Sequence, residues 1–142
     1  MTAIREQIFA KIEELLGTIV GIGEVERMPS GDPSTFPALH IHDEGHSSTE
    51  EEAGSTRYAL AVSIDGFIEG FTGATAHTQL NELYSAVIAK LVTEPPIDGL
   101  AAEIVEGDLK PTVAMLASKR RLAFALDLTI YFATERGNPD AG

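Results

Sequence analysis

The stretch from Arg121 to Glu135 alternates strictly between two kinds of side chain, which rules out most ways of folding it. Its even positions hold large apolar residues, from Leu122 to Phe132, while its odd positions hold mostly small or polar ones. Successive side chains of a β-strand point to opposite faces, so this pattern predicts a strand with one face in a core. Residues 57–65 alternate in the same way. We therefore expect both strands in one sheet, with their bulky faces toward a common core.

Two other segments carry apolar residues at helical spacing. Residues 2–16 form one such stripe, which Gly17 ends, and residues 75–92 form a second, which Pro95 and Pro96 end. Proline cannot donate the backbone hydrogen bond that continues a helix, and glycine is common just past a helix end. Shorter extended segments are expected at residues 18–28, 38–43, 102–106 and 112–117.

The order of these elements predicts the fold class. The strands are grouped instead of alternating with helices, which favours an α+β fold. We expect a mostly antiparallel mixed sheet of about four to six strands, with two main helices packed on one face. The 142 residues suit one hydrophobic core, so residues 1–142 are predicted to form a single domain. Within it, residues 43–55 are predicted to form a mobile acidic loop, and residues 136–142 a frayed tail.

Composition narrows the possible functions. The net charge of −12 repels phosphate backbones and argues against sequence-specific nucleic-acid binding, although an acidic surface can line a channel through which DNA passes. Solubility alone also explains this charge. The absence of cysteine excludes disulfides, thiolate metal sites and a cysteine nucleophile. No apolar run approaches the roughly 20 residues that span a bilayer, and we expect a soluble protein made in the cytoplasm.

Three histidines are the candidate metal ligands. His40 and His42 lie two apart on an expected strand, so their imidazoles point the same way, and His46 follows nearby with Asp43 and Glu44. Imidazoles with a carboxylate can hold zinc or another divalent ion. Because the third histidine falls in the expected loop, an exposed strand with two surface histidines is the favoured interpretation. We assign neither a metal site nor a cofactor.

Two charged clusters are candidate contacts with other subunits or partners: Glu50, Glu51 and Glu52, and Lys119, Arg120 and Arg121. The glutamates either attract a hard cation or a basic partner, or form a solvated charge run, which is the more common case. The basic residues either dock onto an acidic neighbour, such as a second copy of the chain, or lie in a solvated turn.

Sequence motifs of the common enzyme classes are missing from the chain. It has no dinucleotide-binding or phosphate-binding glycine loop, no nucleophile elbow and no zincin motif. Asp32, Asp65 and Asp127 are available as acid and base, but nothing in the sequence pairs any two of them. We therefore assign no catalytic residue and expect a protein that is not an enzyme.

Several pieces match a known layout in their order along the chain. They are the helix ending at Leu15-Leu16-Gly17, residues 23–27, 37–39 and 57–62, the helix with Leu80-Asn81-Glu82-Leu83, residues 98–101, and residues 131–139 in the closing strand. In this layout, nearly the whole chain resembles the tail terminator proteins of long-tailed phages and prophages, the family of the phage lambda minor tail protein U. Head-to-tail joining and tail completion proteins share much of it.

The resemblance implies a ring of about six subunits that caps the tail tube, stops its polymerisation and presents a surface to the head. The implied partners are further copies of the chain, the major tail tube protein and the head connector protein, while DNA passes through without specific binding and no membrane is involved. The implied location is the virion tail, after assembly in the cytoplasm of a bacterial host. The alternatives are a head–tail connector or tail completion protein, and a divalent-metal-binding domain or enzyme that uses the three histidines.

Overall fold

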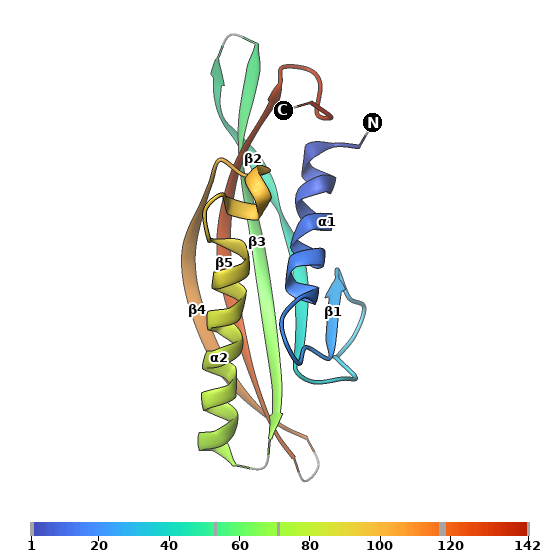
Figure 1. Cartoon of the computed structure of the whole chain (residues 1–142), viewed down its shortest axis with the longest axis vertical. Helices are drawn as coiled ribbons and strands as arrows, with labels where there is room; N and C mark the ends of the chain where they lie inside the picture. The colour runs from blue at the N-terminus through green and yellow to red at the C-terminus, as the bar shows by residue number, and fades with distance from the viewer. Residues whose placement is uncertain (1, 53, 71, 117–118, 142) are drawn as a thin grey trace.

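The computed structural model describes residues 2–52, 54–70, 72–116 and 119–141. Five strands form one sheet in the order β1-β2-β3-β5-β4, and two α-helices lie on one face of it (Figure 1). The strands are β1 (Glu24–Arg27), β2 (Ala38–Glu52), β3 (Ser55–Gly70), β4 (Glu103–Leu116) and β5 (Lys119–Glu135). The helices are α1 (Ile4–Gly17) and α2 (Gly73–Leu91), followed by the 3-10 helix η1 (Pro96–Gly99). Only β1 and β2 pair in parallel, so the predicted α+β fold with a mostly antiparallel mixed sheet is confirmed.

The long strands β3 and β5 form the centre of the sheet. They pair from Ser55 opposite Glu135 to the far ends of both strands without a register shift. Their even-numbered residues face the helices, and Ile64 and Leu126 are at most 1% exposed. The alternation read from the sequence therefore describes the two faces correctly.

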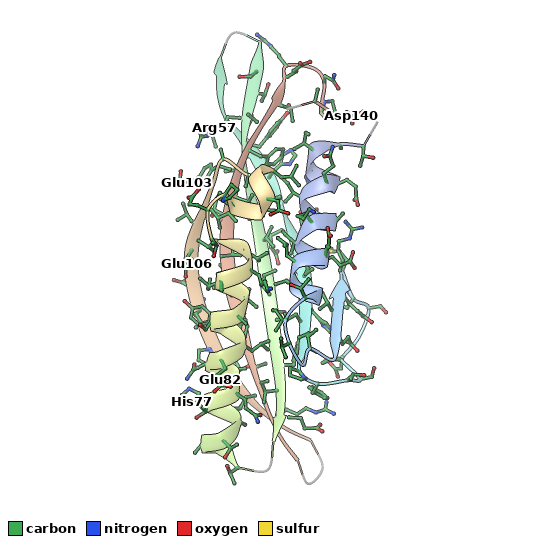
Figure 2. All side chains as sticks on the ribbon, viewed as in Figure 1. Arg57, His77, Glu82, Glu103, Glu106 and Asp140 are labelled. Atoms are coloured by element: carbon green, nitrogen blue, oxygen red, sulfur yellow. The ribbon has the colours of Figure 1, made fainter. Side chains whose placement is uncertain are left out.

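Helix α2 is amphipathic, as its sequence predicts. It buries Leu80 among other apolar residues and exposes His77 and Glu82 (Figure 2). At its start, Oγ1 of Thr72 accepts a hydrogen bond from the backbone N–H of Thr75 at 3.2 Å, which satisfies one of the free donors of the first turn. None of the described helices is both long and apolar enough to cross a bilayer.

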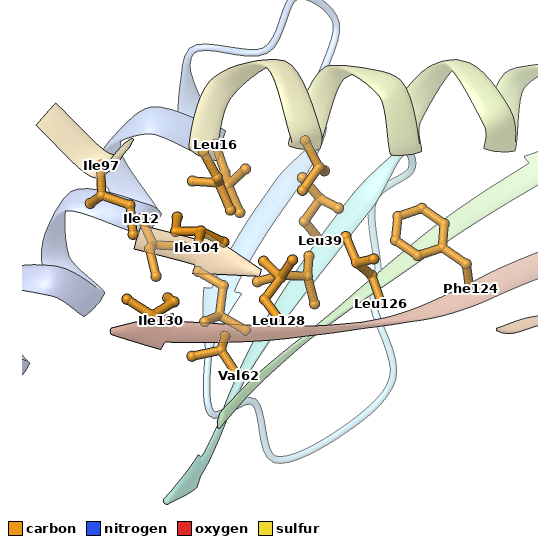
Figure 3. Close-up of a cluster of buried hydrophobic side chains, with 14 of the residues drawn as sticks. Ile12, Leu16, Leu39, Val62, Ile97, Ile104, Phe124, Leu126, Leu128 and Ile130 are labelled. Carbon is orange, nitrogen blue, oxygen red and sulfur yellow. The ribbon is translucent and has the colours of Figure 1, made fainter. Parts of the chain in front are cut away.

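The core lies between the helices and the sheet. Figure 3 shows its centre, where side chains of both layers meet. Ile12 and Leu16 of α1 and Leu128 and Ile130 of β5 are at most 2% exposed. Complete burial of one such side chain stabilises the folded state by about 1.5–3 kcal/mol. This core anchors both helices on the same face and leaves the other face of the sheet without a helix among the described residues (Figure 1).

Residues 43–52 of the expected loop at 43–55 belong to strand β2 instead, and residue 53 lies outside the described residues. β2 continues to Glu52 and pairs with β3 as far as the turn at Gly54, whose φ is +85°. Residues 44–49 are exposed, as predicted, but their backbone is paired. This end of the hairpin projects beyond the helices (Figure 1). A ribbon that meets water on both sides needs no apolar face, so its sequence lacks the alternation by which strands are recognised.

The expected frayed tail folds back on the rest of the chain. The backbone N–H of Arg136 donates to the carbonyl of Gly54 at 2.9 Å, and that of Glu135 donates to Ala141 at 2.7 Å. The N–H of Ile4, in the first turn of α1, donates to the carbonyl of Pro139 at 2.8 Å. The first N–H groups of a helix have no partner within it, so the tail supplies one.

Two further boundaries differ from the expected ones. In place of the two short strands expected at residues 102–106 and 112–117, residues 103–116 form one strand, β4, with a register shift between Glu106 and Leu109. The turn residues between them therefore make a bulge and not a reversal of the chain. Residue 117 lies outside the described residues. In the expected strand at residues 18–28, only Glu24–Arg27 pairs, because the glycine-rich part before it forms turns.

Candidate interaction surfaces

The face of the sheet opposite the helices carries many small side chains near its centre. These side chains come from the odd positions of β3 and β5, and they include Ala59, Ala61, Ser63, Ala123, Ala125 and Thr129. They are half-buried or exposed. We call this surface the open face. Phe67 and Tyr131 stand opposite Ala123 and Ala59 on the same face, so the small residues alternate with a few large ones.

Two histidine–carboxylate pairs lie side by side on the open face. Nε2 of His40 is 2.9 Å from Oε2 of Glu24, and Nε2 of His42 is 3.2 Å from Oδ2 of Asp65. The contact with His40 lowers the pKa of the Glu24 carboxyl below its usual value, against the opposing effect of burial. Backbone N–H and Oγ of Ser34 add two hydrogen bonds of 3.2 Å to the other oxygen of this carboxylate.

His46 lies on the other side of the sheet. A register shift separates Asp43, opposite Val62, from His46, opposite Leu60. Residues opposite each other share a face, and both partners on β3 are buried under the helices. The bulge therefore turns His46 away from His40, and the three histidines do not form one ligand set.

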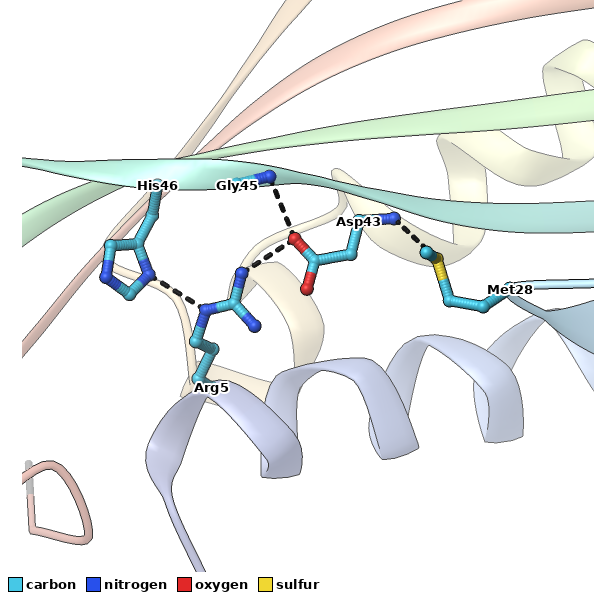
Figure 4. A network of polar contacts seen from close by, with 5 residues as sticks. All are labelled: Arg5, Met28, Asp43, Gly45 and His46. Carbon is cyan, nitrogen blue, oxygen red and sulfur yellow. Dashed lines mark hydrogen bonds and ion pairs between the residues drawn. The ribbon is translucent and has the colours of Figure 1, made fainter.

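His46 instead joins a polar network that ties the start of α1 to β2 (Figure 4). Arg5 donates from Nε to Nδ1 of His46 at 2.8 Å and from Nη2 to Oδ1 of Asp43 at 2.6 Å. The backbone N–H of Gly45 donates to the same Asp43 oxygen at 2.9 Å. The hydrogen bond from Arg5 is the main cause that lowers the pKa of the Asp43 carboxyl.

The two charged clusters lie at opposite ends of the sheet (Figure 1). The backbone of residues 50–52 ends β2 beside Ser55, and residues 119–121 begin β5 beside the far end of β3. The side chains of Glu50, Glu51, Glu52, Lys119 and Arg120 lie outside the described part of the structure. Their role as contacts therefore stays a prediction.

Arg121 is engaged within the chain. Its Nε lies 3.1 Å from Oε2 of Glu69, and its guanidinium carbon lies 4.8 Å from the centre of the Phe36 ring. Its side chain is 27% exposed. Within the predicted basic cluster, Arg121 therefore makes contacts that stabilise the fold.

Two shallow grooves flank α2. One has a volume of about 340 Å³, lies between α2 and residues 19–22, and has Val20 at its rim with 98% of the residue exposed. The other has a volume of about 450 Å³ and lies between the first half of α2 and β4, where Val113 is 66% exposed beside His77. Each groove, with one apolar side chain exposed at it, is a candidate contact surface. Nothing in the local sequence distinguishes these two valines from buried ones.

No protein-family model matches the chain, and no curated protein matches it. Among solved structures, a chain described as "Virion of native gene transfer agent (GTA) particle" is similar, with a TM-score of 0.53 and 17% sequence identity. The chain shares its fold with a chain of a virion. The similarity covers 91% of this chain and 92% of that chain, so it includes the sheet together with both helices. At this identity, it shows the fold alone.

Proposed function

We propose that the protein is a phage-type virion assembly protein of the tail terminator class. Its subunits form a ring of about six copies that caps the tail tube, ends tube polymerisation and offers a surface for head attachment. The observation that carries the proposal is the fold shared with a gene transfer agent virion chain over 91% of the length. The resemblance of the sequence layout to tail terminators adds the specific role. The protein acts without catalysis.

A ring of identical subunits needs two different, complementary surfaces on each subunit. The two edges of the sheet, β1 and β4, face in opposite directions and carry unpaired backbone groups on their outer sides. The two grooves beside α2, with Val20 and Val113 exposed at them, lie on opposite flanks of that helix. These features support a head-to-tail contact between neighbouring copies.

The charge of the chain suits the proposed role. A net charge of −12 repels the DNA backbone, so a ring of these subunits lets DNA pass without holding it. The same charge opposes ring closure at low ionic strength. At 0.1 M salt, repulsion between exposed charges more than about 10 Å apart is largely screened. We therefore expect assembly to increase with salt.

The test is the mass in solution, measured by light scattering over a range of protein, sodium chloride and magnesium concentrations. We expect a species of six times the 15.1 kDa monomer, or a monomer that becomes one as salt rises. Rings should then be visible by negative-stain electron microscopy and should bind the ends of purified tail tubes. A monomer under every condition that also ignores tube ends contradicts the proposal.

A second assay, with filled heads and with growing tail tubes, separates the alternative of a head–tail connector. A connector binds the portal vertex of filled heads and leaves the length of tail tubes unchanged, whereas a terminator binds tube ends and shortens growing tubes. The alternative based on three histidines is not favoured, because His40, His42 and His46 contact different partners on two faces of the sheet.

A further inference from the structure

Three potential metal ligands from two neighbouring strands meet at the β1 edge of the open face. They are Glu24 and Glu26 of β1 and His40 of β2, and one ligand atom from each lies within 4.8 Å of the others. Glu26 stands opposite His40 in the parallel register, and Glu24 stands opposite Ala38. Alternate residues of a strand share a face, so both carboxylates lie on the side of the imidazole. In the part of the chain that the structure describes, no other group of three or more potential ligands comes this close together.

The imidazole of His40 is held in place. The residue is 3% exposed, and its ring centre lies 5.0 Å from that of Phe67. Its Nε2 points at the Glu24 carboxylate. A buried, oriented side chain loses little conformational entropy when it binds a ligand, which favours binding.

The carboxylate of Glu24 is oriented as well. One oxygen faces His40 at 2.9 Å, and the other accepts the N–H and the hydroxyl of Ser34, each at 3.2 Å. In metal sites, hydrogen bonds to the oxygen or nitrogen that does not bind the metal commonly orient the ligand side chain. Two of the three groups are thus already arranged as a metal would require.

We propose that Glu24, Glu26 and His40 bind one zinc ion, with water completing its coordination. One imidazole nitrogen and two carboxylate oxygens are an ordinary set of zinc ligands, and three protein ligands leave a position for water. Two ligand atoms at about 2.0–2.1 Å from a tetrahedral zinc ion lie about 3.3 Å apart. The His40–Glu24 spacing of 2.9 Å is close to that value, and the exposed side chain of Glu26 is able to move inward.

The neighbouring pair of His42 and Asp65 offers an internal comparison. It lies on the same face of the same sheet, with a nitrogen–oxygen distance of 3.2 Å. Within the described chain it has no second carboxylate close enough to form a group of three. The third ligand, Glu26, is therefore what distinguishes the proposed site.

Zinc at this site would link β1 to β2 through side chains of both strands. β1 pairs with β2 only through Glu24–Arg27, and its outer side is the edge of the sheet. An ion that binds only the folded chain stabilises it. Zinc should therefore raise the midpoint of thermal unfolding and slow amide hydrogen exchange within β1.

The experiment is a zinc titration of the whole chain, after treatment with a chelator, followed by calorimetry. We expect one saturable zinc ion per chain. Glu26→Gln should weaken the affinity at least about tenfold, because it removes one ligand charge while the exposed position tolerates the change. Glu82→Gln removes the same charge from an exposed position on α2, and His42→Ala removes the neighbouring imidazole; both should bind zinc as the wild type does.

Nuclear magnetic resonance identifies the histidine independently. Zinc should shift the imidazole signals of His40 and leave those of His42 and His77 in place. The proposal is overturned if no saturable ion binds, if Glu26→Gln binds as tightly as wild type, if Glu82→Gln weakens binding equally, or if another histidine responds. The measurement uses metal affinity alone, so its result is separate from that of the ring-assembly test.

Discussion

The ring of Phe124 fills the space that a side chain on Gly66 would need. The two residues stand opposite each other on β5 and β3, and a Cβ atom added to Gly66 would lie 2.2 Å from Cε2 of that ring. Glycine in the middle of a strand weakens the strand, because glycine loses more backbone freedom on folding than other residues do and has no side chain to pack. Here the aromatic ring covers the gap and buries Gly66 in the core face.

Gly66→Ala should therefore destabilise the protein by about 1–3 kcal/mol, because the added methyl group forces the Phe124 ring to move within a packed core. Urea unfolding measures the loss. Gly31→Ala is the matched control, since Gly31 has open space around it and should change stability by less than about 0.5 kcal/mol. In the double variant with Phe124→Leu, the two effects should not add. Equal stability of Gly66→Ala and wild type would contradict this packing.

Protonation of Asp43 should make the protein less stable in acid. Its pKa is lowered in the folded state from a reference value of 3.8, mainly by the hydrogen bond from Arg5. A lowered folded pKa contributes stability above the unfolded pKa, and this contribution is lost as pH falls below about 4 through the folded value. Asp43→Asn should therefore flatten the fall in unfolding free energy as the pH drops below about 4. Asp108→Asn, at a side chain that is 75% exposed, is the control and should keep the wild-type slope.

Arg5→Lys should weaken the attachment of α1 to β2 although it keeps the charge. Arg5 donates from two nitrogens to two partners, Asp43 and His46, and a lysine ammonium cannot reproduce that fork. We expect a loss of about 0.5–1.5 kcal/mol, the usual net value of one hydrogen bond. Lys11→Ala, which removes a cation beside exposed Glu14 and Asp98, should cost less stability than Arg5→Lys. If the two variants lose equal stability in urea, the network has no special role.

Val113→Asp should impair assembly without unfolding the subunit. This residue is 66% exposed at the groove between α2 and β4, so an added charge costs little in the monomer. In the proposed ring, it would place an unpaired charge in an apolar contact, and the assembled fraction measured by light scattering should fall at least about tenfold. Ser85→Asp adds the same charge at an exposed position on α2 and should assemble normally. Normal assembly of Val113→Asp would exclude this groove from the subunit contact.

Much of the fold could be predicted because its signals are local. The alternation in β3 and β5 and the helical stripe of α2 each reflect a single element that lies on a core, so the period of the apolar residues reveals both its type and its buried face. The same reasoning failed at residues 43–52. There most of the strand extends beyond the core, and its backbone pairs with β3. Its residues are mostly polar and do not alternate with apolar ones, so no strand pattern is visible in the sequence.

The apolar faces of β3, β5 and α2 follow from the sequence alone, as do the end of α1 at Gly17 and the end of α2 before Pro95, because these properties depend on neighbouring residues. The separation of His40, His42 and His46 into different contacts depends on the tertiary structure. The bulge after Asp43 places His46 on the helix side, and the parallel register of β1 brings Glu26 beside His40. Pairing between segments that are distant along the chain depends on how the whole sheet buries its core, and no local pattern encodes that choice.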